Sequence, residues 1–275
     1  MTPFSGRRPF RIPSEDVQID WDFCLSSCSG SASVYFGSWQ DTQVAIKTVT
    51  CNNQEHRLEL QSALIPLSRL PQHQSVLPVL GVVWLSDYRL GIVMEKGEQL
   101  SPTMTLSTKL KHCLEVAEGL QFLHTHNITH TQIKPANVLL VHDHAKLTDV
   151  LVPNVLRHFT VQKFMEPLRQ HYNPPEFPTV CPQSDVYSFG LVFFEVLFNR
   201  SVFDGLELLS IIKMKMNDVE FDFPNFDQLD AHDLNFDTYS KLTCLLSDCC
   251  RRNSSERCSV DHIVSTLGEI VEGTS

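Results

Sequence analysis

The stretch from Ile128 to Val152 constrains the fold of this chain more than any other. It opens with a polar turn, residues 128–137, and continues with an apolar run from Val138 to Val141. A second polar turn, His142 to His144, leads into another run that ends in Asp149. Short apolar runs separated by turn residues are typical of paired strands. The stretch therefore predicts a functional turn followed by a β-hairpin.

The polar residues of this stretch follow a recognisable order. Residues 130–137 read His-Thr-Gln-Ile-Lys-Pro-Ala-Asn, and residues 148–151 read Thr-Asp-Val-Leu. The two segments resemble the catalytic loop HRDxKPxN and the metal-binding DFG segment of the protein kinase superfamily. The resemblance implies that Asn137 and Asp149 hold magnesium and that Lys134 contacts the nucleotide.

Three positions depart from the family pattern. Gln132 stands where the family has its catalytic aspartate, and Thr131 stands where many kinases have an arginine that receives an activation-loop phosphate. Leu151 replaces the glycine of DFG. The glutamine side chain cannot accept a proton at neutral pH, and a positioned general base contributes typically about 10²–10⁴-fold. No intact catalytic residue is therefore expected at these positions.

A second match lies nearer the amino terminus. Strands are predicted over Val34–Trp39 and Val44–Val49, joined by a turn at residues 40–42. Val44-Ala45-Ile46-Lys47 matches the VAIK motif of kinases, in which the lysine pairs the α- and β-phosphates of ATP. The resemblance implies that Lys47, together with Val34, Ala45 and Met94, contacts the nucleotide.

The glycine-rich loop that cradles phosphate in the family is degenerate here. Counting back from Val34, its three glycine positions hold Ala32, Ser29 and Ser27, and Gly30 lies between them. Glycine lets backbone amides approach a phosphate closely and take positive φ without a Cβ penalty. We interpret this segment as a tight hairpin turn, with a weakened phosphate grip as the alternative.

A helix is predicted from Asn53 to Leu70. Pro66 removes a backbone hydrogen bond and costs about 3 kcal/mol in a helix interior, so the helix is expected to end or kink at Ile65. The resemblance places Ala63 where the family has the glutamate that pairs with the VAIK lysine, and Glu59, one turn earlier, is the alternative partner.

Further elements fit the same family. Strands are predicted over Val76–Trp84 and Leu90–Met94, with Met94 at the back of the adenine pocket, and a helix over Leu106–His124. Residues 172–176 are similar to the APE motif, residues 184–190 to SDVWSFG, and residues 246–259 to LxxxCWxxxPxxRPS. The resemblance makes Arg257 the ion-pair partner of Glu176, and it assigns Asp185 to hold the catalytic loop through hydrogen bonds to the loop backbone.

Composition narrows the class of protein. The net charge of −10 is spread along the chain without a block of like charge, which disfavours a nucleic-acid groove. No apolar run is long enough to cross a bilayer, so no membrane association is expected and a cytoplasmic or nuclear location is predicted. The nine cysteines match no zinc-binding spacing, which favours buried free thiols in a reducing compartment.

We therefore predict an α+β, bilobal protein kinase-like fold with a small β-rich N-lobe and a larger helical C-lobe. A flexible arm covers residues 1–15 and the kinase-like domain residues 16–275, with the N-lobe over 16–95, the hinge over 96–99 and the C-lobe over 100–271. The resemblance points to a degenerate member of the tyrosine-kinase-like branch, comparable to integrin-linked kinase.

The expected function is that of a pseudokinase. It would act as a docking scaffold or allosteric regulator for other signalling proteins, an active kinase among them, with weak or absent phosphotransfer. ATP with magnesium is expected to bind weakly if it binds at all. The first alternative is a low-activity serine/threonine kinase that binds magnesium-ATP, and Lys134 fits serine/threonine usage. The second alternative is a nucleotide-operated conformational switch.

Overall fold

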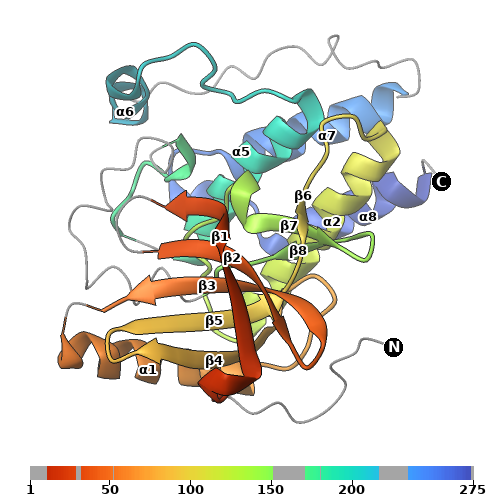
Figure 1. The fold of residues 1–275 in the computed structure, drawn as a ribbon. Helices are drawn as coiled ribbons and strands as arrows, with labels where there is room; N and C mark the ends of the chain where they lie inside the picture. The colour runs from red at the N-terminus through yellow and green to blue at the C-terminus, as the bar shows by residue number, and fades with distance from the viewer. Residues whose placement is uncertain are drawn as a thin grey trace. The chain divides into compact units, whose positions relative to one another are not determined.

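The computed structural model describes residues 11–28, 32–51, 53–150, 171–179, 181–216 and 235–273. The chain divides into two compact units. Unit 1 comprises Met1–Glu98 and Val150–Lys163, and unit 2 comprises Gln99–Asp149 and Phe164–Ser275. Unit 1 is a small, β-rich lobe and unit 2 a larger, mainly helical lobe (Figure 1), so the predicted α+β bilobal class is confirmed.

Unit 1 is built on one antiparallel sheet with the strand order β1-β2-β3-β5-β4. The strands are β1 (Val17–Cys28), β2 (Ala32–Trp39), β3 (Thr42–Thr50), β4 (Val79–Ser86) and β5 (Arg89–Glu95). Gln40 and Asp41 join β2 to β3 with φ of 50° and 58°, the left-handed pair that a two-residue hairpin turn requires. Short turns of this kind keep strands that are adjacent in sequence adjacent in the sheet.

One face of the sheet buries a hydrophobic cluster. Its members come from the segment before β1 and from all five strands: Ile12, Val17, Trp39, Val44, Ile46, Leu80, Val83 and Val93. Gly37 of β2 lies where a Cβ atom would collide with the Ile46 side chain and the Gln18 carbonyl. A larger residue at position 37 would therefore push β1 and β3 away from β2.

Strand β1 was not predicted. Its apolar residues alternate along the edge of the sheet, and Trp21 and Phe23 remain 48% and 66% exposed. A register shift between Asp20 and Cys24 interrupts its pairing with β2. The alternation is the signal that was available, since period-two patterning marks a strand even where the residues are not buried.

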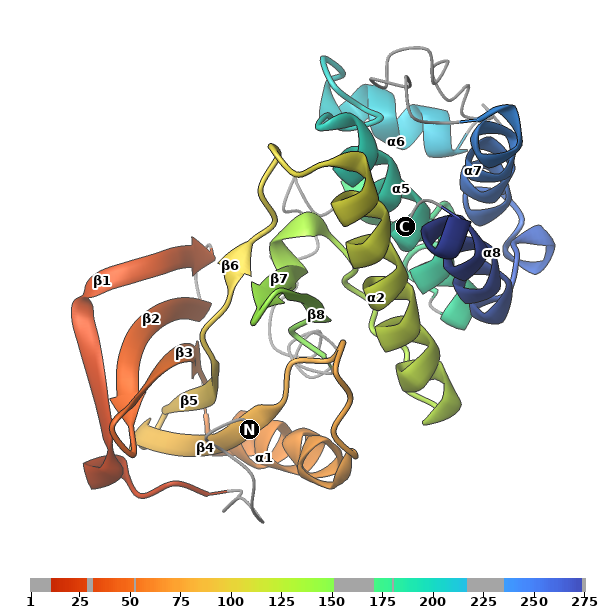
Figure 2. The same ribbon diagram turned by 90° about the vertical axis from the view of Figure 1, so that its right-hand side faces the viewer.

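Helix α1 (Gln54–Arg69) contacts β4 at the side of the sheet, as Figures 1 and 2 both show. Leu60 is fully buried, and the Arg57 guanidinium stacks over Trp84 at 4.2 Å. Of the two outcomes predicted at Ile65, the helix end does not occur, because α1 continues past Pro66 to Arg69, close to the predicted limit at Leu70. A proline removes one backbone hydrogen bond from a helix. The contacts of the first half of α1 with the sheet can compensate for that loss.

Unit 2 contains five helices among the described residues. They are α2 (Leu106–Thr125), α5 (Pro182–Phe198), α6 (Leu208–Met216), α7 (Phe236–Cys249) and α8 (Val260–Gly273). Helix α2 packs against α5 and α8 and against β8, and α5 packs against α7 (Figure 2). The Thr105 side chain caps α2 by accepting a hydrogen bond from the Thr108 N–H. Helix α2 is therefore the central element of this lobe.

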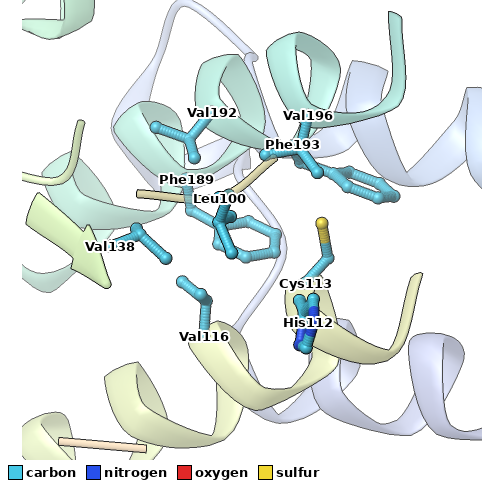
Figure 3. A pocket seen from close by; sticks show the side chains of 9 residues that line it. All are labelled: Leu100, His112, Cys113, Val116, Val138, Phe189, Val192, Phe193 and Val196. Atoms are coloured by element: carbon cyan, nitrogen blue, oxygen red, sulfur yellow. The ribbon is translucent and has the colours of Figure 1, made fainter. Parts of the chain in front are cut away.

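A small apolar cavity lies between parts of α2 and α5 (Figure 3). It is lined by Leu100, by Val138, by His112, Cys113 and Val116 of α2, and by Phe189, Val192, Phe193 and Val196 of α5. Its volume of about 10 Å³ corresponds to about one water molecule, and an apolar lining offers such a molecule few partners. The cavity is a packing imperfection of the core and too small for an organic ligand.

The predicted hairpin after the polar turn is present as β7 (Val138–Val141) and β8 (His144–Leu147), joined by His142 and Asp143 at positive φ. With β6 (Glu98–Gln99), at which the two units divide, it forms a sheet of order β6-β7-β8. Most strand bounds differ from the sequence prediction by one or two residues, and two of the differences have a clear cause. Strand β8 ends at Leu147 and not at Asp149, since Asp149 has a left-handed φ of 67°. Strand β4 begins at Val79 and not at Val76, because Pro78 lacks the N–H that a ladder needs.

Within the described ranges, no helix combines the length and the apolar character needed to cross a bilayer.

Candidate functional site

One buried carboxylate, that of Asp185, fixes the backbone of the catalytic-loop segment, residues 130–137 of unit 2. Asp185, in the first turn of α5, accepts hydrogen bonds from the backbone N–H groups of His130 and Thr131, both at 2.7 Å. The Nε2 atom of His124 lies 3.0 Å from the same carboxylate and donates to it, because an ionised carboxylate can only accept. The Asp185 side chain is 1% exposed, so these charge-assisted bonds lie away from solvent.

The backbone of Thr131 is in an unfavourable conformation that Asp185 stabilises. Thr131 has a φ of 67°, and a β-branched residue at positive φ is an outlier that costs on the order of 1–3 kcal/mol. The hydrogen bond from its N–H to Asp185 compensates part of that cost. The turn is therefore built by the long-range contact and not by local preference.

His130 connects the loop to the strand that follows it. Its Nδ1 accepts a hydrogen bond from the Gln132 N–H at 3.2 Å, which leaves Nε2 as the protonated nitrogen that donates to the Thr148 carbonyl at 2.9 Å. Burial lowers the pKa of His130, although the nearby Asp185 carboxylate opposes that shift. His130 is therefore a neutral, fixed spacer between the loop and Asp149.

Asn137 completes the loop. Its Nδ2 donates to the Gln132 carbonyl at 2.8 Å, and its backbone carbonyl accepts from the Thr148 N–H at 3.0 Å. With Nδ2 committed, the side-chain oxygen is the remaining donor atom for a cation. Lys134, half-buried, precedes the 3₁₀ turn η2 (Pro135–Asn137), and its carbonyl accepts from the Asn137 N–H.

The loop position at which the family has its general base carries the amide side chain of Gln132. Gln132 is half-buried, and its backbone atoms are committed to His130 and Asn137 as described above. The loop backbone is thus fixed by hydrogen bonds at residue 132, whereas the side chain there has no proton-accepting group at neutral pH. Leu151, the third departure, lies outside the described residues.

The donor set of Asn137 and Asp149 is compatible with magnesium that is also bound to phosphate. Magnesium prefers oxygen ligands and is usually held by one or two carboxylates together with substrate phosphates. Asp149 supplies one carboxylate, is half-buried, and occupies a left-handed conformation. Within the described chain, no group of three or more histidine, cysteine or acidic side chains is placed to hold a metal by itself.

Four nucleotide candidates of unit 1 share one face of the sheet. Lys47 lies opposite Val34 on β2, and Ala45 lies opposite Met94 on β5. Opposed residues of an antiparallel pair point to the same face, as do residues two apart on a strand. Lys47, Ala45 and Met94 are buried and Val34 is half-buried. The sheet therefore gathers these side chains on the face opposite the Ile46 cluster.

The predicted clamp partners of Lys47 are less well placed. Glu59 of α1 is exposed and makes no ion pair with any residue that the structure describes. The side chain of Ala63 lies outside the described residues. The loop that would cradle phosphate joins β1 to β2, which pair as far as Cys28 and Ala32. Ser29 and Gly30 of this loop are likewise outside the described residues. Glu59 therefore does not act as the clamp in this structure.

Glu176 and Arg257 form the second anchor of unit 2. Arg257 donates from Nη1 and Nη2 to the two carboxylate oxygens of Glu176, at 2.7 and 2.8 Å, and Ser184 Oγ donates to the same carboxylate. Burial raises the pKa of Glu176, but the hydrogen bonds from Arg257 and Ser184 outweigh it, so the pKa is lowered overall. Arg257 also donates to the carbonyls of Arg251 and Arg252.

A buried lysine that the sequence reasoning missed lies nearby. Lys215 of α6 donates from Nζ to the carbonyls of His171 and Asn173, both at 2.7 Å, and lies over the rings of Tyr187 and Phe203. Burial lowers its pKa to about 7. The lysine-bearing pattern of α6 resembles a solvated helix face, so no local signal marks Lys215. His124, in the last turn of α2, was missed because its partner Asp185 is 61 residues away in sequence.

Comparison with known proteins identifies the family. The sequence pattern of the family described as "Protein kinase domain" matches residues 29–267. The chain therefore belongs to the protein kinase domain family, whose members in general use ATP and magnesium.

Relatives of the chain occur in plants and in an amoeba. U-box domain-containing protein 33 of Arabidopsis thaliana is 27% identical over 83% of this chain and 29% of its own length. A probable serine/threonine-protein kinase of Dictyostelium discoideum is 28% identical, over 87% and 40%. Receptor-like protein kinase HERK 1 of Arabidopsis thaliana is 30% identical, over 74% and 27%. The chain spans less than half the length of each of these relatives.

Proposed function

We propose that this chain is a pseudokinase of the tyrosine-kinase-like branch, which docks other signalling proteins and regulates an active kinase among them. One observation carries the proposal. The backbone of the catalytic loop is held by Asp185 and His130, while the position of the general base carries the amide of Gln132. A scaffold of this kind presents a kinase-shaped surface without the group that deprotonates an acceptor hydroxyl.

The neighbouring substitutions support the same function. Thr131 stands where an arginine would receive an activation-loop phosphate, so switching by phosphorylation of that loop is not expected. The position of the family's clamp glutamate holds Ala63, and the alternative, Glu59, is exposed. We place the protein in the cytoplasm or nucleus, and the eight cysteines that the structure describes as free thiols support this location.

Weak binding of ATP with magnesium remains part of the proposal. Asn137 and Asp149 would hold the metal, Lys47 and Lys134 would contact phosphate, and the apolar side chains of Val34, Ala45 and Met94 would contact the base. When bound, ATP supplies a γ-phosphoryl group whose charge the metal neutralises. In the absence of a base, the roles left to this chain are to bind and to orient.

The proposal is tested by phosphoryl transfer. The chain and its Lys47→Ala variant are incubated with radiolabelled ATP, magnesium and a generic protein substrate. We expect the same background label for both. Robust transfer that Lys47→Ala abolishes would refute the assignment.

A low-activity serine/threonine kinase is the second candidate function. It is favoured by the shared face of Val34, Ala45, Lys47 and Met94 and by the matching relative that is named a serine/threonine kinase. A ligand at one hundred times its dissociation constant stabilises a fold by about 2.7 kcal/mol. Thermal melting at millimolar ATP, with and without magnesium, measures this. A flat response excludes the second candidate and leaves the scaffold.

A nucleotide-operated switch is the third candidate, because Asn137 is positioned by the same loop that Asp185 holds. Partner binding by the Asn137→Ala, Asp149→Ala double variant distinguishes it from the scaffold. The scaffold predicts unchanged affinity for a partner recovered with the wild-type chain. The switch predicts that affinity no longer responds to ATP.

A further inference from the structure

Two cysteines of unit 2 lie in direct contact. Cys249 ends α7 and is fully buried, and Cys258 follows the 3₁₀ turn η6 (Ser254–Glu256) and is half-buried. Their Sγ atoms are 3.7 Å apart, and the Cys258 N–H donates to the Asp248 carbonyl. The two thiols therefore connect the end of one helix to the segment that leads into the next.

Both residues sit in the carboxy-terminal motif noted in the sequence. Counted back from Arg257, Cys249 falls at the motif cysteine, and Cys258 occupies the place of the proline that follows the arginine. A proline at that place could form no sulfur contact. The sulfur pair is therefore a departure of this chain from the family pattern.

The two thiols are chemically unequal. The hydrogen bond from the Cys249 S–H lowers the pKa of Cys258, which the residue's partial burial only partly opposes. Burial raises the pKa of Cys249, and the hydrogen bond to Cys258 adds to that shift. The thiolate is the nucleophilic form of cysteine. Cys258 is thus the more readily ionised sulfur and the one that solvent can reach, with a protonated thiol behind it.

We propose that Cys249 and Cys258 are a redox modification site that forms a reversible disulfide with hydrogen peroxide as oxidant. The Cys258 thiolate attacks one peroxide oxygen, the O–O bond breaks, and the other oxygen leaves as water after protonation, so that Cys258 becomes a sulfenic acid. The Cys249 sulfur then attacks Cys258 and loses its proton, the S–S bond forms, and the second oxygen leaves as water. Two electrons from the thiols reduce one peroxide to two waters, and a dithiol reductant reverses the reaction.

The disulfide would close the loop that holds Arg257. This loop, residues 250–257, contains Arg257 and the carbonyls of Arg251 and Arg252 to which Arg257 donates. Cross-linking its ends restricts the loop in the unfolded chain and in local openings. Oxidation therefore stabilises the anchor that Arg257 makes with Glu176.

Cys250, the sequence neighbour of Cys249, is a poor competitor in this reaction. Cys250 is buried with Sγ directed to the Tyr187 carbonyl at 3.9 Å, and burial raises its pKa to about 12. It also packs beside Gly190, where an added Cβ would lie 2.7 Å from its sulfur. Cys244 is exposed on α7 and serves as the matched control.

The test treats the reduced full-length chain with equimolar hydrogen peroxide, blocks remaining thiols by alkylation, and maps peptides by mass spectrometry. We expect a peptide pair joined through Cys249 and Cys258, two hydrogens lighter than its parts and separated again by dithiothreitol. Cys244→Ser should leave the yield unchanged, and Cys258→Ser should reduce it to background. Cys249→Ala should leave Cys258 as a trapped sulfenic acid.

A second readout does not depend on variants that alter packing. The oxidised wild-type chain should melt roughly 5 °C higher than the reduced chain, since a disulfide commonly stabilises by an amount that shifts melting by several degrees. Oxidation that leaves these two sulfurs unlinked, or a cross-link without any change in melting, would overturn the proposal. Neither of these two outcomes tests phosphoryl transfer, so the redox proposal and the pseudokinase proposal can fail independently.

Discussion

The two anchors of unit 2 and the tip of its catalytic loop keep different parts of the kinase pattern. At the anchors, Asp185 and Arg257 carry the family's residues, and each side chain is buried and makes several hydrogen bonds. At the tip, Gln132 and Thr131 differ from the family's residues, although the backbone that carries them is held in place. Shape and chemistry are thus supplied by separate sets of side chains.

The difference has an energetic basis. The Arg257 side chain is fully buried and Asp185 nearly so, and removing one partner of a buried charge pair leaves the other uncompensated. Gln132 is half-buried and its side chain need not be charged for the loop to keep its shape. A substitution at either anchor would therefore destabilise the fold, whereas a substitution of Gln132 at the base position need not.

The largest expected effect tests the carboxy-terminal anchor. Arg257→Met removes the hydrogen bonds to Glu176 and leaves its carboxylate, only 22% exposed, without the guanidinium, so we expect a loss of up to about 3–5 kcal/mol in the free energy of unfolding. Urea denaturation measures it. The control is Arg251→Met, whose exposed pair with Asp248 should contribute no more than about 1 kcal/mol. Equal losses of unfolding free energy in Arg257→Met and Arg251→Met would contradict the proposed difference between the anchor and the exposed ion pair.

The next effect is a pH dependence from Lys215. Its pKa is about 7 in the folded chain and its ordinary value is 10.5, so above pH 7 the unfolded chain holds a proton that the folded chain has released. Stability contributed by this group therefore rises with pH, by about 1.4 kcal/mol per pH unit at most. We expect the wild-type chain to gain stability relative to Lys215→Met between pH 7 and pH 9. Parallel profiles would show that the lysine is not buried as described.

A smaller effect tests the support of the catalytic loop. Asp185→Asn places an NH₂ group where one backbone N–H needs an acceptor, so we expect a loss of about 1–3 kcal/mol. Asp261→Asn is the matched control, because Asp261 is exposed and accepts one hydrogen bond from Gln121. Amide hydrogen exchange at His130 and Thr131 should accelerate only in Asp185→Asn. Unchanged exchange there would break the assignment of Asp185 as the support.

The smallest expected effect is at the tip. Gln132→Asp restores the family's carboxylate at a half-buried site, so we expect the free energy of unfolding to change by less than about 0.5 kcal/mol. Phosphoryl transfer should stay at background, because the clamp and the phosphate cradle remain degenerate. Restored turnover in Gln132→Asp would mean that the missing base is the only defect.

The sequence predicted the elements whose pattern is local. The turn at residues 40–42 and the strand Val138–Val141 follow from β-branched runs bounded by turn residues, and the helix from Leu106 follows from its apolar spacing. It missed the edge strand β1, and one of its two alternatives at Pro66, a helix end, does not occur because α1 continues to Arg69. Motif matching also suggested which distant residues meet, such as Glu176 and Arg257. No motif marked Lys215 or His124. Lys215 donates to backbone carbonyls and His124 to a carboxylate, and these partners are far away in sequence.

The packing of α2 against α8 has a consequence for biosynthesis. Gln121 and Asp261 are joined by a hydrogen bond across 140 residues of chain, and the apolar stripe of α2 depends on α8 for part of its cover. At about 5–20 residues per second, a ribosome delivers α8 roughly 7–30 s after α2. For that interval the nascent lobe exposes Leu and Val side chains that the finished lobe hides. Chaperone contact during translation is therefore expected to concentrate on α2, with release once α8 emerges.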